Sequence, residues 1–220
     1  MEPCSMPITA HECFYHRWWP HSLIVGTEAP TLFLILISME RICAVVKPGL
    51  YDRVFNRSTK KIMIVISLIV VLISVCVAGV SAYDNRTTVK SGHCPIISST
   101  AIWYSTTHFL FIILGYSASF LSLIIMKWYT MRFASSSDRL RRHDSKTNIL
   151  IAFTGSSVAL VASPSVVMIG IRWSLFQLDD VFVALTYSTT AFVSIANTVI
   201  NFAYREEFRL AFRSILYKMG

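Results

Sequence analysis

The twenty lysine and arginine residues of this 220-residue chain are absent from five long stretches. These nearly uncharged stretches cover residues 23–39, 62–82, 100–126, 148–171 and 181–204. The six segments around them hold one, six, two, six, one and four basic residues in chain order. Alternate segments therefore total 16 and 4, and cytoplasmic loops are the ones that retain Lys and Arg. The pattern predicts five membrane crossings, with the N-terminus outside and the C-terminus in the cytoplasm.

The length and composition of these stretches indicate how the chain crosses the bilayer. A helix that spans the hydrocarbon core needs about 20 apolar residues. The chain is 54% hydrophobic and 15% charged, with a mean hydropathy of +0.57, which excludes an ordinary soluble domain. In lipid only a helix satisfies its own backbone groups, and the stretches lack the alternating polarity of barrel strands. We predict one all-α membrane domain over residues 1–220, a transmembrane helical bundle with helices at about 23–45, 62–82, 100–130, 148–171 and 181–204.

The residues after the last span change from apolar to amphipathic. Apolar side chains recur there at three- and four-residue spacing, namely Phe208, Ala211, Phe212, Ile215 and Leu216. Residues 205–218 are therefore predicted to form a short amphipathic helix that lies on lipid at the inner membrane surface. The net charge of +8 lies in the loops that flank the spans, where topology already explains it, so no nucleic-acid partner is expected.

The predicted topology assigns cysteines and glycosylation sequons to the two sides of the membrane. Cys4, Cys13 and Cys94 fall outside, where disulfides persist. A Cys13–Cys94 bond would tie the mouth of the first span to the loop after the second, and free or differently paired thiols are the alternative. The Asn85 sequon lies in an outer loop and is expected to carry a glycan, whereas the Asn56 sequon lies inside and is expected to stay bare.

Two ionisable residues inside the predicted spans are candidates for a ligand pocket. Glu28 lies 12 residues, about 18 Å of helix, from Glu40, which places it near the middle of the bilayer. Ionisable groups at that depth are costly and usually functional, so Glu28 is a candidate ligand contact or internal polar tie. The alternative is a protonated Glu28 bonded to a neighbouring Ser or Thr. His108 lies toward the outer half of its span, and Trp103 and Tyr104 nearby are typical of an interfacial aromatic belt.

Catalytic and cofactor chemistry finds no support in the spans. An intramembrane enzyme would need clusters of His, Cys or Asp inside them, and the sequence holds none. We therefore expect no catalytic residues, no metal and no other cofactor. A five-span transporter or channel component is the alternative function. It would show paired intramembrane charges or broken helices at matching positions, and only Glu28 qualifies.

The inner end of the first span carries a motif with fixed spacing. Glu40 precedes Arg41, and Ala44, Pro48 and Tyr51 follow the Arg at three, seven and ten positions. This arrangement resembles the acid-Arg motif that closes the third transmembrane helix of rhodopsin-like G-protein-coupled receptors. One local pair with three fixed offsets at a cytoplasmic helix end makes the resemblance fairly specific.

The last two spans carry weaker matches to the same family. Asn197 to Asn201, followed after six residues by Phe208, resembles the family's Asn-Pro-x-x-Tyr motif and surface helix, although Thr and Asn stand for its Pro and Tyr. Pro164 matches the kink proline of the family's sixth helix. Such departures are frequent in the divergent chemosensory receptors of nematodes, which the chain resembles more than it does amine or opsin receptors.

The resemblance implies five spans that correspond to family helices three to seven, with helices one and two missing, in a receptor or a truncated fragment of one. It implies that Glu40 holds Arg41 at rest, and that Asp144 contacts Arg41 from the cytoplasmic end of the sixth family helix. Asp144 lies 20 residues, about 30 Å of helix, before Pro164, the point about which that helix would swing. The implied partners are a small-molecule or peptide ligand outside the plasma membrane and the α-subunit of a heterotrimeric G protein inside it.

Two ligand classes are disfavoured by the same resemblance. The last span contains no Lys, which excludes a retinal Schiff base. The first span carries Leu23 where amine receptors place an Asp, which disfavours an amine ligand.

Overall fold

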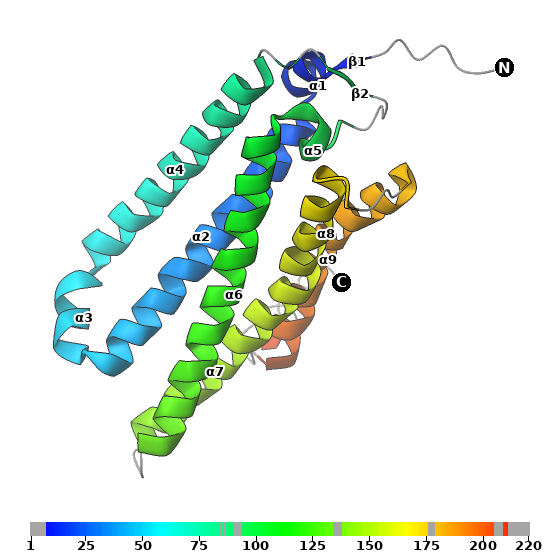
Figure 1. Ribbon diagram of the computed structural model, residues 1–220. Coiled ribbons are helices and arrows are strands. Elements are labelled where there is room, and N and C mark those ends of the chain that lie inside the picture. The colour runs from blue at the N-terminus through cyan, green and yellow to red at the C-terminus, as the bar shows by residue number, and fades with distance from the viewer. Residues whose placement is uncertain are drawn as a thin grey trace, which may run out of the picture.

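The computed structural model is a bundle of long helices (Figure 1). The described residues are 8–83, 85, 87–89, 94–133, 138–175, 179–204 and 209–210. In chain order the elements are β1 (Ile8–Thr9), α1 (Ala10–His16), α2 (Trp19–Val46), α3 (Pro48–Val54), α4 (Arg57–Tyr83), β2 (Thr88–Val89), α5 (Ile96–Ser99), α6 (Ile102–Phe133), α7 (Asp138–Ser157), the π-helical turn η1 (Val158–Ala162), α8 (Ser163–Arg172) and α9 (Asp180–Tyr204). The predicted all-α fold class is confirmed.

Five helical segments of the described chain are long and apolar enough to cross a membrane. They are Trp19–Val46, Arg57–Tyr83, Ile102–Arg132, Thr147–Arg172 and Val181–Tyr204. The predicted spans overlap them one for one. The first two segments begin at residues 19 and 57 rather than 23 and 62, because polar and interfacial residues extend each helix beyond its apolar stretch.

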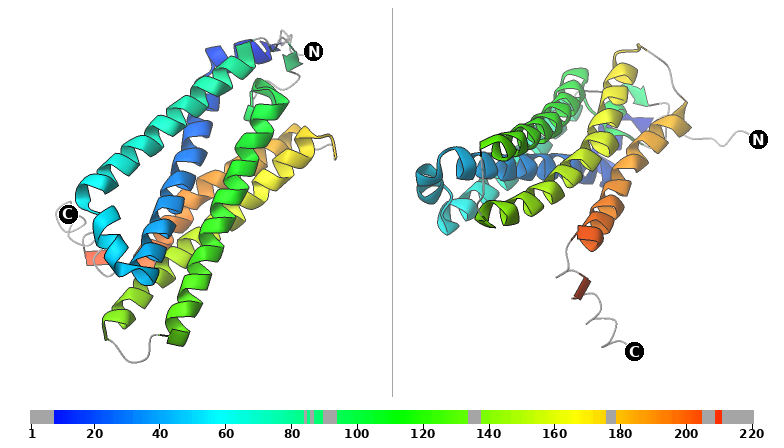
Figure 2. Two further views of the ribbon diagram at one scale, coloured as in Figure 1. Left: turned by 60° about the vertical axis from the view of Figure 1, so that its left-hand side comes forward. Right: turned by 90° about the horizontal axis from the view of Figure 1, so that it is seen from below.

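The helices α2 and α6 lie side by side at the centre of the bundle (Figures 1 and 2). On one side α4 packs against α2, and on the other side α7, η1 and α8 pack against α6. The last helix, α9, packs against α7, η1 and α8. Much of α4 faces away from the bundle with exposed apolar side chains such as Ile64, Val65 and Ile69, as expected of a helix that faces lipid tails.

Gly115 allows the close approach of α6 to α2. A Cβ atom added at Gly115 would overlap the methyl group of Thr31 and lie 3.3 Å from Cδ1 of Ile35. Thr31 is fully buried, and its hydroxyl donates to the carbonyl of Thr27 at 2.7 Å. Small residues that let helix backbones approach closely are typical of packing within membranes. Gly115 therefore limits the distance between the two central helices.

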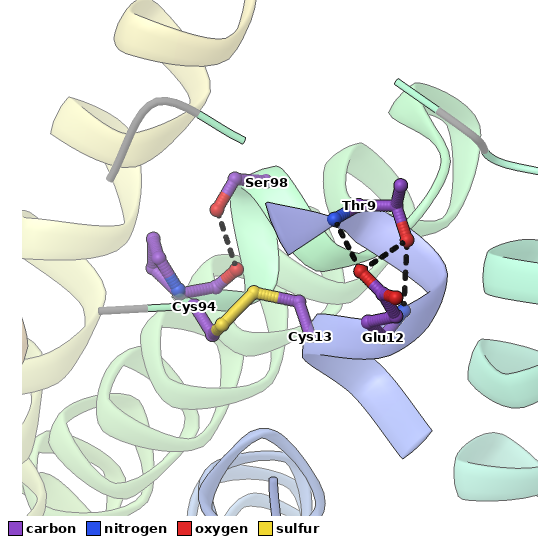
Figure 3. Close-up of a disulfide and its surroundings, with 6 residues drawn as sticks. Thr9, Glu12, Cys13, Cys94 and Ser98 are labelled. Atoms are coloured by element: carbon purple, nitrogen blue, oxygen red, sulfur yellow. Dashed lines mark hydrogen bonds between the residues drawn. A yellow bond between two sulfur atoms is a disulfide. The ribbon is translucent and has the colours of Figure 1, made fainter. Parts of the chain in front are cut away.

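A small cap closes one end of the bundle, which we call the outer end; the opposite end, which carries α3, is the inner end (Figure 1). The strands β1 and β2 pair antiparallel, with Ile8 opposite Val89. A disulfide joins Cys13 of α1 to Cys94, and their Cα atoms lie 5.3 Å apart (Figure 3). Tyr15 donates to the carbonyl of Gly79 at 3.0 Å, which fixes α1 to the end of α4. The cap thus joins the start of the chain to the connection between α4 and α6.

A capping box begins α1. The hydroxyl of Thr9 accepts a hydrogen bond from the amide of Glu12 at 3.2 Å, and the Glu12 carboxylate accepts one from the amide of Thr9 at 3.0 Å (Figure 3). Both bonds satisfy amide groups that the first turn of a helix leaves without partners.

Two sequence-based expectations fall largely on other residues. The surface helix expected at 205–218 lies outside the described residues, apart from Arg209 and Leu210, which are helical. Cys4 also lies outside them.

Candidate functional site

A carboxylate and an imidazole meet inside the bundle. Glu28 of α2 and His108 of α6 are 5% and 3% exposed, and Oε1 of Glu28 lies 2.6 Å from Nδ1 of His108. The sequence indicates the two residues as separate candidates, and the structure brings them together. A carboxyl and an imidazole that share one proton carry no net charge wherever that proton resides, which lowers the cost of burying them.

Ser74 of α4 is the second partner of Glu28. Its hydroxyl donates to Oε1 of Glu28 at 2.8 Å and lies 2.9 Å from the hydroxyl of Tyr104. Tyr104 was expected in an interfacial belt, but it is 4% exposed and stacks on the ring of His108, with 6.0 Å between ring centroids. We call Glu28, Ser74, Tyr104 and His108 the polar cluster. It ties α2, α4 and α6 together, and the described residues include no group of three His, Cys, Asp or Glu that could hold a metal.

A small cavity lies beside the polar cluster, between α2, α6, α8 and α9. Its volume is about 20 Å³, enough for one water molecule. The polar side chains in its wall are Thr27, His108, Ser165, Thr186, Tyr187 and Thr190, and the remaining lining residues, Pro164 among them, are apolar. The cavity therefore touches four of the long helical segments at once.

His108 connects the polar cluster to this cavity. Its Nδ1 atom is bonded to Glu28, whereas its Nε2 atom lies 3.4 Å from the hydroxyl oxygen of Thr27. Thr27 directs its own hydroxyl hydrogen to the carbonyl of Leu23 at 2.8 Å. A displacement of the cavity wall therefore alters the contacts of His108 and, through them, the buried Glu28–His108 pair.

A change of helix type precedes Pro164. The turn η1 (Val158–Ala162) is π-helical and ends two residues before the proline. A π turn widens the helix by one residue, and a proline removes a backbone donor and clashes with the preceding turn, so the two together form a hinge. The sequence predicts a kink at Pro164 but not the π turn, because no residue pattern marks where the extra residue is inserted.

At the inner end, Glu40 is held by residues of α3 and α4. Its Oε1 atom accepts from Nζ of Lys60 at 2.7 Å and from the hydroxyl of Tyr51 at 3.2 Å. Nζ of Lys60 also lies 5.5 Å from the centroid of the Tyr51 ring. The motif residues Glu40 and Tyr51 are therefore in contact, and Lys60 is a partner that sequence analysis missed. Its only signal was its place in a basic segment.

The remaining residues of the inner-end motif lie on the expected helices. Arg41 is in the last two turns of α2, and Pro48 is the first residue of α3, where a proline needs no hydrogen-bond partner. Asp144 lies in α7, and its side chain is outside the described part of the chain. The contacts expected of Arg41 with Glu40 and with Asp144 stay predictions.

The two asparagines of the last span lie on α9. Asn197 is partly buried. Asn201 lies one turn further along α9, and the structure does not describe its side chain. The role in receptor activation that their resemblance to the Asn-Pro-x-x-Tyr motif implies stays a prediction.

At the outer end, Arg172 and Trp173 fasten α8 to the start of α6. The guanidinium of Arg172 donates to the carbonyl of Ile97 and, at 2.8 Å, to the carbonyl of Thr100. Nε1 of Trp173 donates to the hydroxyl of Thr106 at 3.2 Å. In the sequence Arg172 is only the single basic residue of an outer segment, and these contacts are not predicted there, because the acceptors are mostly backbone carbonyls.

The expected glycosylation site lies near the outer end. Asn85 precedes β2, and its Oδ1 atom accepts from the hydroxyl of Thr87 at 2.7 Å. Asn56, the second sequon, caps α4 through its Oδ1 atom, which accepts from the amide of Thr59 at 2.8 Å.

Comparison with known proteins adds one match. A sequence model of the family described as "Serpentine type 7TM GPCR chemoreceptor Srx" matches residues 5–204, a range that contains α1 through α9. No curated protein sequence matches the chain.

Proposed function

The chain belongs to the Srx family of serpentine chemoreceptors, and we propose that it carries a chemical signal from outside the cell to a heterotrimeric G protein inside it. Family membership and five helices of membrane-spanning length make it an integral, multi-pass membrane protein. Receptors of this kind generally have a ligand on one side and a G protein on the other.

The proposed orientation has the cap of α1, β1 and β2 outside and α3 in the cytoplasm. Its support is the basic-residue count of 16 against 4 in alternate segments, because the richer set remains in the cytoplasm. Glu40, Arg41, Pro48 and Tyr51 would then face the G protein.

The observation that carries the proposal is the shared wall of the cavity. His108 of the polar cluster and Pro164 after the π turn line the same small space. A ligand that enters this space has to push α8 and α9 away from α2 and α6, because the resting volume admits one water only. The hinge at η1 and Pro164 converts that displacement into a swing of α7 at the inner end.

The swing of α7 has a consequence for the inner end of α2. In the proposed mechanism, Asp144 on α7 leaves Arg41, and the exposed Arg then binds the α-subunit of the G protein. Glu40 keeps its partners Lys60 and Tyr51, which hold α3 and α4 in place as a fixed platform. The ligand acts by binding the open arrangement better than the closed one.

Nucleotide exchange tests this proposal. The full chain is placed in lipid nanodiscs with a heterotrimeric G protein, and exchange is measured with eight-carbon alcohols, ketones, carboxylates and amines as probes. At least one probe series should accelerate exchange by roughly fivefold or more, and Arg41→Ala should abolish the acceleration. Lys61→Ala, which removes an exposed basic residue of α4, is the matched control and should leave it unchanged. Exchange that never exceeds the rate with empty nanodiscs would refute the proposal.

A further inference from the structure

The Ser and Thr hydroxyl groups in the cavity wall have no hydrogen left for a ligand. A Ser or Thr hydroxyl has one hydrogen to donate and two lone pairs to accept. Each of the four in the wall donates to a carbonyl of its own helix: Thr27 to Leu23 at 2.8 Å, Ser165 to Val161 at 2.7 Å, Thr186 to Phe182 at 2.7 Å and Thr190 to Tyr187 at 2.7 Å. This pattern is common for hydroxyls inside helices, and it leaves only lone pairs facing the cavity.

His108 supplies a hydrogen-bond donor to the cavity. When the buried Glu28–His108 pair is neutral overall, the proton between them occupies the short Oε1–Nδ1 contact of 2.6 Å, and the second ring proton is on Nε2. That Nε2–H points at Thr27 over a long 3.4 Å. A better acceptor can therefore take it. The buried hydroxyl of Tyr187, which also lines the cavity, completes no hydrogen bond and is a second donor.

The described residues that line the cavity carry no unbalanced charge. The ionisable ones among them are His108, which Glu28 neutralises, and Tyr187. A charged ligand would lose its hydration without gaining an opposite charge, which is costly in an apolar surrounding. The remaining lining is apolar, so the body of the ligand has to be apolar as well.

We propose that this receptor recognises small, uncharged, largely apolar molecules that bear a hydroxyl group. The hydroxyl oxygen accepts from Nε2–H of His108, and the hydroxyl hydrogen donates to the lone pairs of Thr186 or Thr190 on α9. A hydroxyl group therefore bonds both to the donor His108 and to an acceptor on α9, whereas a ketone or an ether bonds only to the donor. The inference rests on the proposed function, because it names the ligand class of the same cavity.

Binding of three molecules of matched shape tests the ligand class. Cyclohexanol, cyclohexanone and methylcyclohexane are titrated against the full chain in nanodiscs by saturation-transfer NMR. Cyclohexanol should bind roughly threefold to tenfold more tightly than cyclohexanone, and the ketone should in turn exceed the hydrocarbon, because each lost hydrogen bond costs about one such factor. Cyclohexylammonium and cyclohexanecarboxylate should bind more weakly than the alcohol.

Three variants test which side chains bind the hydroxyl group of the ligand. Thr186→Val and Thr190→Val keep the shape of the wall, and at least one of them should remove the preference for the alcohol over the ketone without weakening the binding of the ketone. Thr107→Val is the matched control, because Thr107 is an exposed residue of α6 with the same bond to its own helix, to Trp103 at 2.8 Å. His108→Phe should lower the alcohol and the ketone to the level of the hydrocarbon.

The outcomes separate the ligand class from the proposed function. Equal affinity for alcohol and ketone, an unchanged preference in both Thr variants, or tighter binding of a charged probe would overturn the ligand class. Alcohol binding that never stimulates the G protein would leave the ligand class standing and refute the signalling function. Arg41-dependent stimulation that is stronger with the ketone or the carboxylate than with the alcohol would refute the ligand class and support the signalling function.

Discussion

Glu28 keeps its carboxyl group inside a membrane helix because it has two hydrogen-bond partners. His108 and Ser74 both bond to its Oε1 atom, and Tyr104 completes the contact from Ser74. Removing one member of a buried pair costs far more than the pair contributes, because the survivor is left buried without a partner.

The first prediction concerns this pair. Glu28→Leu and His108→Phe should each lower the free energy of unfolding by about 3–5 kcal/mol, and the double variant should lose much less than the sum. The measurement is chemical denaturation of the full chain in detergent micelles, arranged as a double-mutant cycle. Ser188→Ala, an exposed residue of α9, is the control and should stay within about 0.5 kcal/mol of the unmodified chain. Additive losses would show that the two side chains do not interact.

A second prediction at this scale concerns pH at the outer cap. The amide of Thr9 and then its hydroxyl donate to Glu12 and hold the pKa of that carboxyl below its ordinary value of 4.5. Because the folded pKa is the lower one, the stabilisation is complete above the ordinary value and is lost as pH falls through the folded value. The protection factors of the α1 amides in hydrogen exchange, which are corrected for the intrinsic pH dependence of the exchange rate, should therefore fall at acid pH. Glu12→Gln should lower these protection factors at neutral pH and remove their dependence on pH.

At the scale of elements, α2 and α6 form the centre of the bundle, and α4, α7 and α8 pack against them. The two helices approach at Gly115, and both carry residues of the polar cluster. A wider spacing would therefore lengthen the Glu28–His108 contact and open the cavity wall. The packing at Gly115 therefore affects the distance between Glu28 and His108.

The third prediction concerns this glycine. Gly115→Ala should destabilise the chain by about 1–3 kcal/mol, because the new methyl overlaps Thr31, a stiff β-branched residue held by its own hydrogen bond. Gly26→Ala is the control, since an added Cβ there meets nothing within 4 Å, and it should be neutral or slightly stabilising. Thermal unfolding of both variants in the same detergent is the measurement. An equal shift in both would show that backbone freedom, rather than packing, controls the response.

At the scale of the whole molecule, the connections between spans alternate between two ends. The outer end carries the disulfide-bonded cap and the hydrogen bonds of Arg172 to Ile97 and Thr100, and the inner end carries α3 with the contacts of Glu40. The proposed orientation assigns the oxidising side of the membrane to the end with the disulfide, as disulfide chemistry requires.

The fourth prediction tests this orientation. Expression in eukaryotic cells should attach a glycan at Asn85, so Asn85→Gln should increase gel mobility as much as treatment with a glycosidase does. Ser58→Ala removes the inner sequon but keeps Asn56 as the cap of α4, and it should leave mobility unchanged. A shift in gel mobility with Ser58→Ala and none with Asn85→Gln would show that the topology is the opposite of the proposed one.

The sequence by itself determined the membrane class, the number of spans and the expected topology, because a bilayer acts on hydrophobic length and on charge, which are both local properties of a chain. It also singled out Glu28 and His108, since an ionisable group inside a span is conspicuous wherever it points.

Only the tertiary structure decided which polar groups meet. Ser74 and Tyr104 resemble ordinary span residues until α4 and α6 pack against α2, and Lys60 resembles any basic loop residue until α3 folds back on Glu40. Residue spacing likewise does not predict the π turn before Pro164 or the hydrogen bonds from wall hydroxyls to helix carbonyls. The physical reason is that a hydrogen bond depends on distance and direction between atoms, and helix packing sets both.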